Sequence, residues 1–185
     1  MSKPFLAKFL PKQEKDLADV EIEDGSSPRA IVVGYGPVGQ TLTRILMESD
    51  IEPLIIDMNV DTVRRLRSKG KKAIYGDASS VEILTSAGIK NAEFILVTLP
   101  HEIRYEIVAT ALSLNPDIKI ILRAHYLSEQ NNLTQSSISA VVYEELEAAV
   151  ALADTLLKEM GVEEDTVKEK VEAIRNELTA PRTAA

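Results

Sequence analysis

RAIVVGYGPVGQTLTRIL, residues 29–46, is the most informative stretch of this chain for its fold. An apolar run leads into three glycines, Gly34, Gly36 and Gly39, and then into apolar residues at helical spacing. In such a strand–turn–helix unit the first glycine permits a tight turn, the second lets the backbone approach a phosphate, and the third lets the helix pack on the strand. The N-terminus of the helix supplies N–H donors and a partial positive charge. The stretch therefore predicts an anion-binding turn between a strand and a helix.

Apolar runs of strand length recur along the rest of the chain, and segments with helical spacing separate them. The six runs are AIVVG, PLIID, KAIYG, FILVT, KIILR and SAVVY, at residues 30–34, 53–57, 72–76, 94–98, 119–123 and 139–143. Strand–helix alternation predicts parallel strands with crossover helices, and the unbroken apolar character of the runs indicates that both faces are covered. We therefore expect an α/β fold, a Rossmann-like doubly wound parallel sheet of about six strands.

The chain divides into three segments by composition. Residues 1–28 carry lysines in their first half and aspartates and glutamates in their second, and we expect a linker or disordered leader. A connector in which PFLAKFL packs on a partner is the alternative. Residues 29–160 are expected to form the ligand-binding domain. Residues 161–185 are expected to form an additional C-terminal helix and tail, whose apolar stripe needs a partner surface on this chain or on a second copy.

The composition excludes several classes of protein. The formal net charge of -8 and the pI near 4.9 argue against nucleic-acid binding, because phosphate contact needs a basic surface. The chain has no cysteine, and its two histidines, His101 and His125, lack ligand spacing, so we expect no metal site. No apolar run approaches the roughly 20 residues that span a bilayer, and the first residues do not resemble a signal peptide. We expect the chain to be cytoplasmic.

Asp57 ends the second apolar run, 18 residues beyond Gly39. A carboxylate at this place accepts hydrogen bonds from the ribose hydroxyls of an adenosine. It disfavours NADP, because it repels a 2′-phosphate. The turn also matches the spacing of a P-loop, but Gln40 stands where that motif requires lysine, so we reject a P-loop NTPase. The glycine turn and Asp57 together predict an adenine nucleotide.

Further candidate residues follow the third, fourth and fifth apolar runs. Asp77, in YGDAS, would contact the adenine edge or cap the next helix, and both roles remain open. Thr98, Leu99 and Arg123 follow at the carboxyl ends of the next two runs. Ligands of open α/β sheets bind at this edge, so these side chains are expected to border the same pocket.

Four stretches resemble the RCK/KTN (TrkA-N) family of regulatory domains: VVGYGPVGQ, IIDMN, AIYGDASSVEILTSAGIKNAEFILVTLP and IILRA. They are most similar to the cytoplasmic domains of Kef-type potassium efflux systems and related cation/proton antiporters, over residues 29 to about 160. The resemblance implies a regulatory domain at the inner face of the membrane that binds AMP, ADP or NAD(H). It implies gating of a potassium efflux channel or cation/proton antiporter, pairing as a homodimer, and no catalytic residue.

The resemblance also implies which residues contact the ligand. They are Gly34, Tyr35, Gly36, Pro37, Val38, Gly39, Asp57, Met58, Asp77, Ala78, Thr98, Leu99 and Arg123. Many members carry arginine where Pro37 stands, which disfavours ATP here. Glu144 and Glu145 fall where some members place a contact, but we interpret them as carboxylates of a helix N-terminus. Regulation by glutathione is left open.

The sequence leaves two alternative functions open. One is an NAD-dependent oxidoreductase, or its cofactor-binding half. Only 42 residues follow the sixth apolar run, too few for a substrate domain, and no Tyr-x-x-x-Lys pair exists. His101 is the single acid/base candidate near the pocket. The other is a structural domain with an empty pocket.

Overall fold

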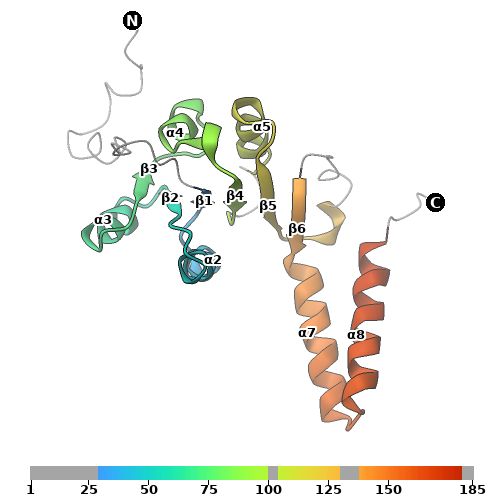
Figure 1. Ribbon diagram of the computed structural model, residues 1–185. Coiled ribbons are helices and arrows are strands. Elements are labelled where there is room, and N and C mark those ends of the chain that lie inside the picture. Colours follow the sequence, from blue (N-terminus) through green and yellow to red (C-terminus); the bar gives the residue numbers. More distant parts are fainter. Residues whose placement is uncertain (1–28, 100–103, 130–137, 181–185) are drawn as a thin grey trace, which may run out of the picture.

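The expected α/β fold is confirmed. The structure, a computed structural model, describes residues 29–99, 104–129 and 138–180. Six parallel strands form one sheet in the order β3-β2-β1-β4-β5-β6 (Figure 1). The strands are β1 (Ala30–Val33), β2 (Leu54–Asp57), β3 (Ala73–Tyr75), β4 (Phe94–Val97), β5 (Lys119–Ala124) and β6 (Ile138–Tyr143). The predictions for residues 1–28 and for His101 lie outside the described residues.

Helices cover both faces of the sheet (Figure 1). They are α2 (Pro37–Glu48), α3 (Val60–Ser68), α4 (Val81–Ser86), α5 (Arg104–Leu114), α7 (Glu144–Glu159) and α8 (Glu164–Thr179), with short 3₁₀ turns η2 (Ile89–Asn91) and η3 (Leu127–Glu129). Because side chains alternate along a strand, Ile31 joins the core beneath α4 and α5, whereas Val32 joins a second core beneath α2 and α3. The continuous apolar runs of the sequence are therefore explained by two cores on one sheet.

The strand order reverses between β1 and β4. From β1 the chain builds outward through β2 to β3, and it then returns to the other side of β1 with β4. Val33 pairs with Ile56 of β2 and with Val97 of β4. The next residue of each strand, Gly34, Asp57 and Thr98, therefore lies at one carboxyl edge. This edge is the topological switch point of the sheet.

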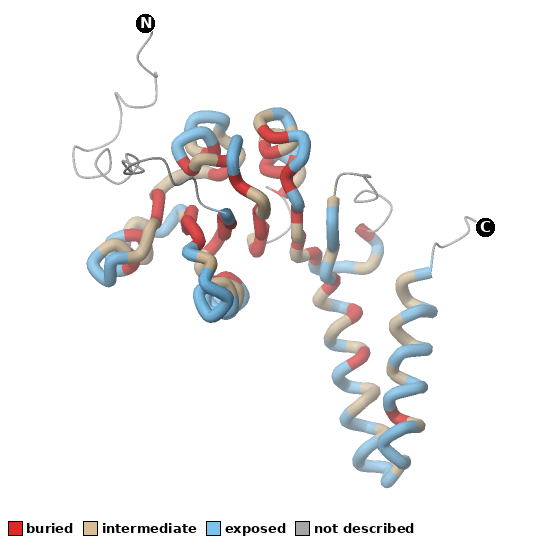
Figure 2. Tube along the Cα trace, viewed as in Figure 1, coloured by how far each residue is buried: buried red, intermediate tan, exposed pale blue. Residues whose placement is uncertain are grey.

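The last two helices form a hairpin that projects away from the sheet (Figure 1). Most of its surface is exposed or half-buried (Figure 2). Val167 of α8 is nevertheless 1% exposed, and Arg175 donates two hydrogen bonds, 2.5 and 3.0 Å long, to the carboxylate of Glu147 in α7. The additional C-terminal helix thus finds its partner surface on its own chain. Among the described helices, none is long and apolar enough to cross a bilayer.

Candidate functional site

The glycine turn has the close contacts that its spacing predicts. Gly34 has a φ of +91°, which L side chains rarely adopt, and its N–H donates to the carbonyl of Ile56 at 2.9 Å. A Cβ on Gly39 would lie 2.0 Å from the carbonyl oxygen of Gly34, so only glycine lets α2 approach the end of β1 this closely. A Cβ on Gly36 would meet no atom within 4 Å among the described residues. The second glycine therefore borders open space.

The N-terminus of α2 presents backbone donors to that space. Gly36 is the N-cap residue, and no side chain caps the helix. Pro37 occupies the first turn and has no N–H, whereas Val38 and Gly39 carry first-turn N–H groups for which an α-helix has no internal acceptor. These amides and the helix dipole make the opening suitable for an anion.

Asp57 is bound by two backbone amides. The Tyr35 N–H donates to its Oδ2 and the Asn59 N–H to its Oδ1, both at 2.7 Å. Each carboxylate oxygen keeps a further lone pair, so the group can still accept one hydroxyl on each oxygen. The Tyr35 amide, which the resemblance places among the ligand contacts, therefore donates to Asp57 in this structure. The Asp57 carboxylate therefore holds the glycine turn in place, and it lies at the switch point of the sheet.

The residues after β2 and β3 lie beside Asp57. Met58 is 59% exposed, and the Gly76 N–H donates to the Asp57 carbonyl at 3.2 Å, which joins the ends of the two strands. Asp77 accepts a hydrogen bond of 2.9 Å from the Ser79 N–H, in the turn before α4. The N-cap of α4 is Ser80, so Asp77 closes the preceding turn and does not cap the helix itself. The side chain of Ala78 is buried in the core.

Thr98 fixes the glycine turn from the other side. Its side chain is buried. Its hydroxyl is within hydrogen-bond distance of two carbonyl oxygens, that of Val33 at 2.9 Å and that of Gly34 at 3.1 Å, and it can donate to either. Leu99 is half-buried, and its Cδ2 would lie 2.8 Å from a Cβ on Gly34. Both residues therefore border the turn, and the Thr98 hydroxyl is already occupied by backbone.

Arg123 continues this edge onto β5. Its Nη1 donates to the Thr98 carbonyl at 3.0 Å, and its Nε donates to Glu144, the first residue of α7. His125 Nδ1 lies 3.0 Å from the other Glu144 oxygen. The Arg123 hydrogen bond is the main cause that holds the pKa of Glu144 below its ordinary value, and His125 adds to it. Glu144 and the Thr98 carbonyl thus hold the Arg123 side chain at the carboxyl edge of the sheet.

The sequence did not predict the ion pair that holds the segment after β5. Arg104 of α5 and Glu129 of η3 form a buried ion pair, 1% and 4% exposed, and Arg104 also donates to the Arg123 carbonyl. Glu129 accepts the N–H groups of His125 and Tyr126 at 3.1 and 2.8 Å. Because its hydrogen-bonding groups have partners, this buried ion pair fixes the position of the segment that follows β5. Only the adjacency of α5 and η3, which the sequence does not display, distinguishes these two residues.

Hydrogen bonds join the candidate residues into one edge of the sheet. They link Tyr35 to Asp57, Thr98 to Gly34, and Arg123 to Thr98. Gln40, at the place of the P-loop lysine, donates its side-chain amide to the Tyr35 carbonyl at 3.1 Å. No group of three metal-ligating side chains occurs among the described residues. The arrangement can accept a diol at one side and an anion at the other.

The sheet order and the glycine turn define a Rossmann-like α/β domain. Residues 30–144 match the family model of the TrkA-N domain, and the chain belongs to this family. The putative cation/proton antiporter YbaL of Escherichia coli (strain K12) is 35% identical over 158 residues, which cover 82% of this chain and 28% of YbaL. The crystal structure of the TrkA-N domain of that inner membrane protein is 37% identical, with a TM-score of 0.66, and covers 71% of this chain and 98% of that domain.

Two Kef proteins are also similar. The glutathione-regulated potassium-efflux system protein KefC of Klebsiella pneumoniae is 32% identical over 178 residues, which cover 93% of this chain and 28% of KefC. The Kef CTD of Shewanella denitrificans in its AMP-bound form is 24% identical, with a TM-score of 0.73, over 82% of this chain and 93% of that structure, a similarity that shows the fold. The chain spans about 28% of the length of the curated relatives it matches.

Proposed function

We propose that this chain binds an adenine nucleotide at the switch point and regulates a cation transport protein of the membrane. One observation carries the proposal: the Asp57 carboxylate, oriented by two backbone amides, stands beside the uncapped N-terminus of α2. The ribose hydroxyls would bind Asp57, and the α-phosphate would bind the N–H groups of Val38 and Gly39. Gly36 leaves the space through which the phosphate approaches.

AMP, ADP or NAD(H) fits this site better than ATP or NADP. Pro37 brings neither an N–H nor a positive charge to the turn, and Gln40 already binds the Tyr35 carbonyl, so distal phosphates lack a cationic partner there. Asp57 would repel a 2′-phosphate. AMP is the ligand of the Shewanella denitrificans Kef CTD, which supports a monophosphate as the first nucleotide to test.

The role we propose is regulation without catalysis. YbaL is described as an antiporter and KefC as part of a potassium-efflux system, which supports a membrane transport protein as the partner. Bound nucleotide can shift such a partner only through a different affinity for two states of the domain. We accordingly propose a potassium channel or cation/proton antiporter as the effector, and the inner face of the membrane as the place where the domain works.

A homodimer is part of the same proposal. Leu152 and Leu156 of α7 and its C-cap residue Met160 are spaced four residues apart along one side of the helix, and they are 71%, 60% and 67% exposed. Val142 of β6, which precedes α7 in the sequence, is 46% exposed. An apolar stripe of this kind suits a second copy of the chain. Sedimentation of the Leu156→Glu variant, compared with Lys170→Glu on the neighbouring helix, tests the dimer.

Calorimetric titration of the purified chain with AMP, ADP, NADH and ATP tests the nucleotide site. We expect saturable binding of AMP, ADP or NADH with a Kd below about 1 mM, and weaker binding of ATP. Gly36→Val should weaken binding at least about tenfold while thermal unfolding of the free chain changes little, because its side chain enters open space. Lys170→Ala, on α8, is the matched control. The absence of saturable binding by every nucleotide would reject the proposal.

A further inference from the structure

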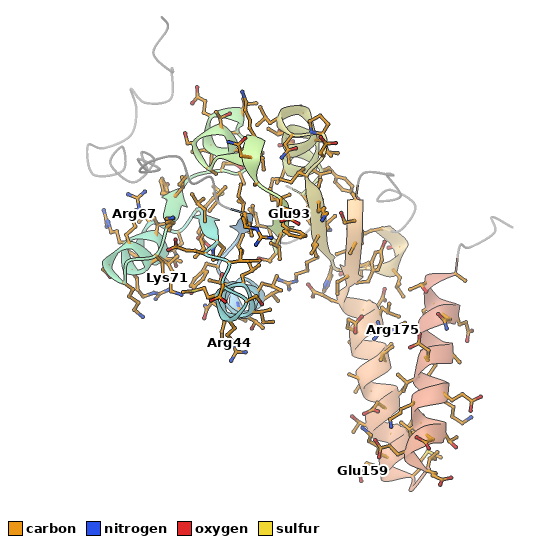
Figure 3. The ribbon with its side chains drawn as sticks, viewed as in Figure 1. Arg44, Arg67, Lys71, Glu93, Glu159 and Arg175 are labelled. Atoms are coloured by element: carbon orange, nitrogen blue, oxygen red, sulfur yellow. The ribbon has the colours of Figure 1, made fainter. Side chains whose placement is uncertain are left out.

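A strongly basic surface lies on α3 and the turn that leads into β3. Residues 61–72 contain six basic side chains and one acidic one, a formal charge of +5 in a chain whose net charge is -8. This basic patch consists of Arg64, Arg65, Arg67, Lys69, Lys71 and Lys72. Figure 3 labels Arg67 and Lys71 on the α3 side of the molecule. The patch lies away from the glycine turn, toward the end at which β3 begins, so the nucleotide proposal does not use it.

Half of the basic patch has no acidic partner among the described residues. Lys72 forms an ion pair of 2.8 Å with Glu52, and Arg64 one of 3.6 Å with Asp61. Within residues 29–99, 104–129 and 138–180, no carboxylate forms an ion pair with Arg65, Lys69 or Lys71. A surface with this much uncompensated charge of one sign attracts an anionic partner.

A small hollow adjoins the basic patch at Lys71 and Lys72. It is lined by two lysines, Lys71 and Lys72, by Glu52, which pairs with Lys72, by Thr43, and by three apolar residues, Met47, Pro53 and Ile55. Thr43 is 1% exposed, yet its hydroxyl has no hydrogen-bond partner among the described residues. Buried polar groups are almost always partnered. Met47 is 45% exposed at the rim. The hollow has a volume of about 10 Å³, room for one water molecule beside Thr43, so a partner would contact its exposed rim at Met47 and Lys71.

The chain itself contains a segment of opposite charge. Residues 16–24, DLADVEIED, carry five acidic side chains and no basic one, interleaved with four apolar residues. Their formal charge of -5 matches the +5 of residues 61–72. We propose that residues 16–24 bind the basic patch of the same chain, with carboxylates on Arg65, Lys69 and Lys71 and an apolar side chain against the exposed Met47.

The topology brings the two within reach of each other. Residues 16–24 end five residues before Arg29, which directly precedes β1. Only β2 separates β1 from β3, and neighbouring strands are about 4.8 Å apart, so the turn that enters β3 lies about 10 Å away. Five extended residues span up to about 17 Å. A tether this short gives the segment an effective concentration of about millimolar, an advantage that a lipid or another protein lacks.

Charge exchange in the full chain tests this interaction. The patch variant is Lys69→Glu with Lys71→Glu, the leader variant is Glu21→Lys with Glu23→Lys, and the combined variant carries all four changes. Lys170→Glu, an exposed lysine of α8, is the control. We measure thermolysin cleavage within residues 16–24, and zero-length carbodiimide cross-links between these carboxylates and Lys69, Lys71 or Lys72.

We expect cross-links at 50 mM salt that decline at least about fivefold at 1 M salt, because exposed charge pairs are screened. Cleavage should accelerate about five- to tenfold in the patch variant and in the leader variant, and it should return toward the parent rate in the combined variant. Equal cleavage in parent, patch variant and control would overturn the proposal, as would a combined variant that stays fast. Patch-dependent binding to phosphatidylglycerol vesicles, with residues 16–24 cleaved equally fast in parent and patch variant, would identify lipid as the occupant and also overturn it.

Discussion

Gly39→Ala tests the close approach of α2 to the end of β1. The new Cβ would lie 2.0 Å from the Gly34 carbonyl oxygen, 3.0 Å from its carbonyl carbon and 3.4 Å from the Thr98 hydroxyl. Real Cβ contacts are rarely shorter than 3.0 Å, so α2 would have to move by about 1 Å away from the end of β1. No side-chain rotation relieves this overlap, because the nearest atoms belong to the backbone.

The expected loss in the free energy of unfolding is at the upper end of the overpacking range, about 3 kcal/mol. For a chain of this size, each kcal/mol shifts the Tm by about 2–4 °C, so we expect a Tm lower by roughly 6–12 °C. Gly36→Ala is the matched control, since its Cβ meets nothing within 4 Å and its φ of -71° suits any residue. We expect the control to change stability by less than about 0.5 kcal/mol.

Urea and thermal unfolding of the two variants, followed by far-UV circular dichroism, make the comparison. If the free energy of unfolding of Gly39→Ala lies within about 0.5 kcal/mol of that of Gly36→Ala, the contact at the start of α2 does not constrain the fold. A loss shared equally by both variants would point instead to helix propensity or unfolded-state effects.

Three further predictions concern polar groups. Thr98→Val should lower the free energy of unfolding by about 1 kcal/mol, because the hydroxyl no longer donates to the glycine turn; urea unfolding measures this, and no loss would contradict it. Glu129→Ala should cost about 3–5 kcal/mol, since it leaves Arg104 buried without its carboxylate; a loss below 1 kcal/mol would show that the pair is dispensable. The Arg175 hydrogen bond lowers the pKa of Glu147, so its stabilisation of the α7–α8 hairpin is complete above the ordinary value of 4.5 and is lost as pH falls through the lowered pKa. Hydrogen exchange of α8 should therefore accelerate below pH 4.5, and Arg175→Ala should remove that dependence.

Much of the fold follows from local sequence patterns. The apolar runs identify all six strands because both faces of this sheet are buried, so each strand reads as an unbroken apolar stretch. The glycine spacing locates the turn at β1, because Gly34 needs a positive φ and Gly39 meets backbone. These constraints act between residues close in sequence, and a pattern can display them.

The contacts between distant segments could not be predicted in the same way. The sequence singles out Asp57 as a ribose acceptor, but that its carboxylate also binds the Tyr35 amide depends on how β1 and β2 pair. In the sequence, Glu144 has the position of an ordinary carboxylate in the first turn of a helix. Only the pairing of β5 with β6 shows that it binds Arg123. No local pattern distinguishes Arg104, which packing buries against Glu129.

Amide NMR of the ¹⁵N-labelled chain during titration with AMP shows whether a nucleotide binds between Asp57 and the start of α2. Such binding predicts saturable shifts at Gly36, Val38 and Gly39, which surround the phosphate opening, and at Tyr35 and Asn59, whose N–H groups donate to Asp57. Asp57→Asn should weaken all of these shifts together, while amides of α8 stay in place. Saturable shifts confined to other surfaces, or spectra unchanged at 5 mM of AMP, ADP and NADH, would mean that no adenine nucleotide binds at the switch point.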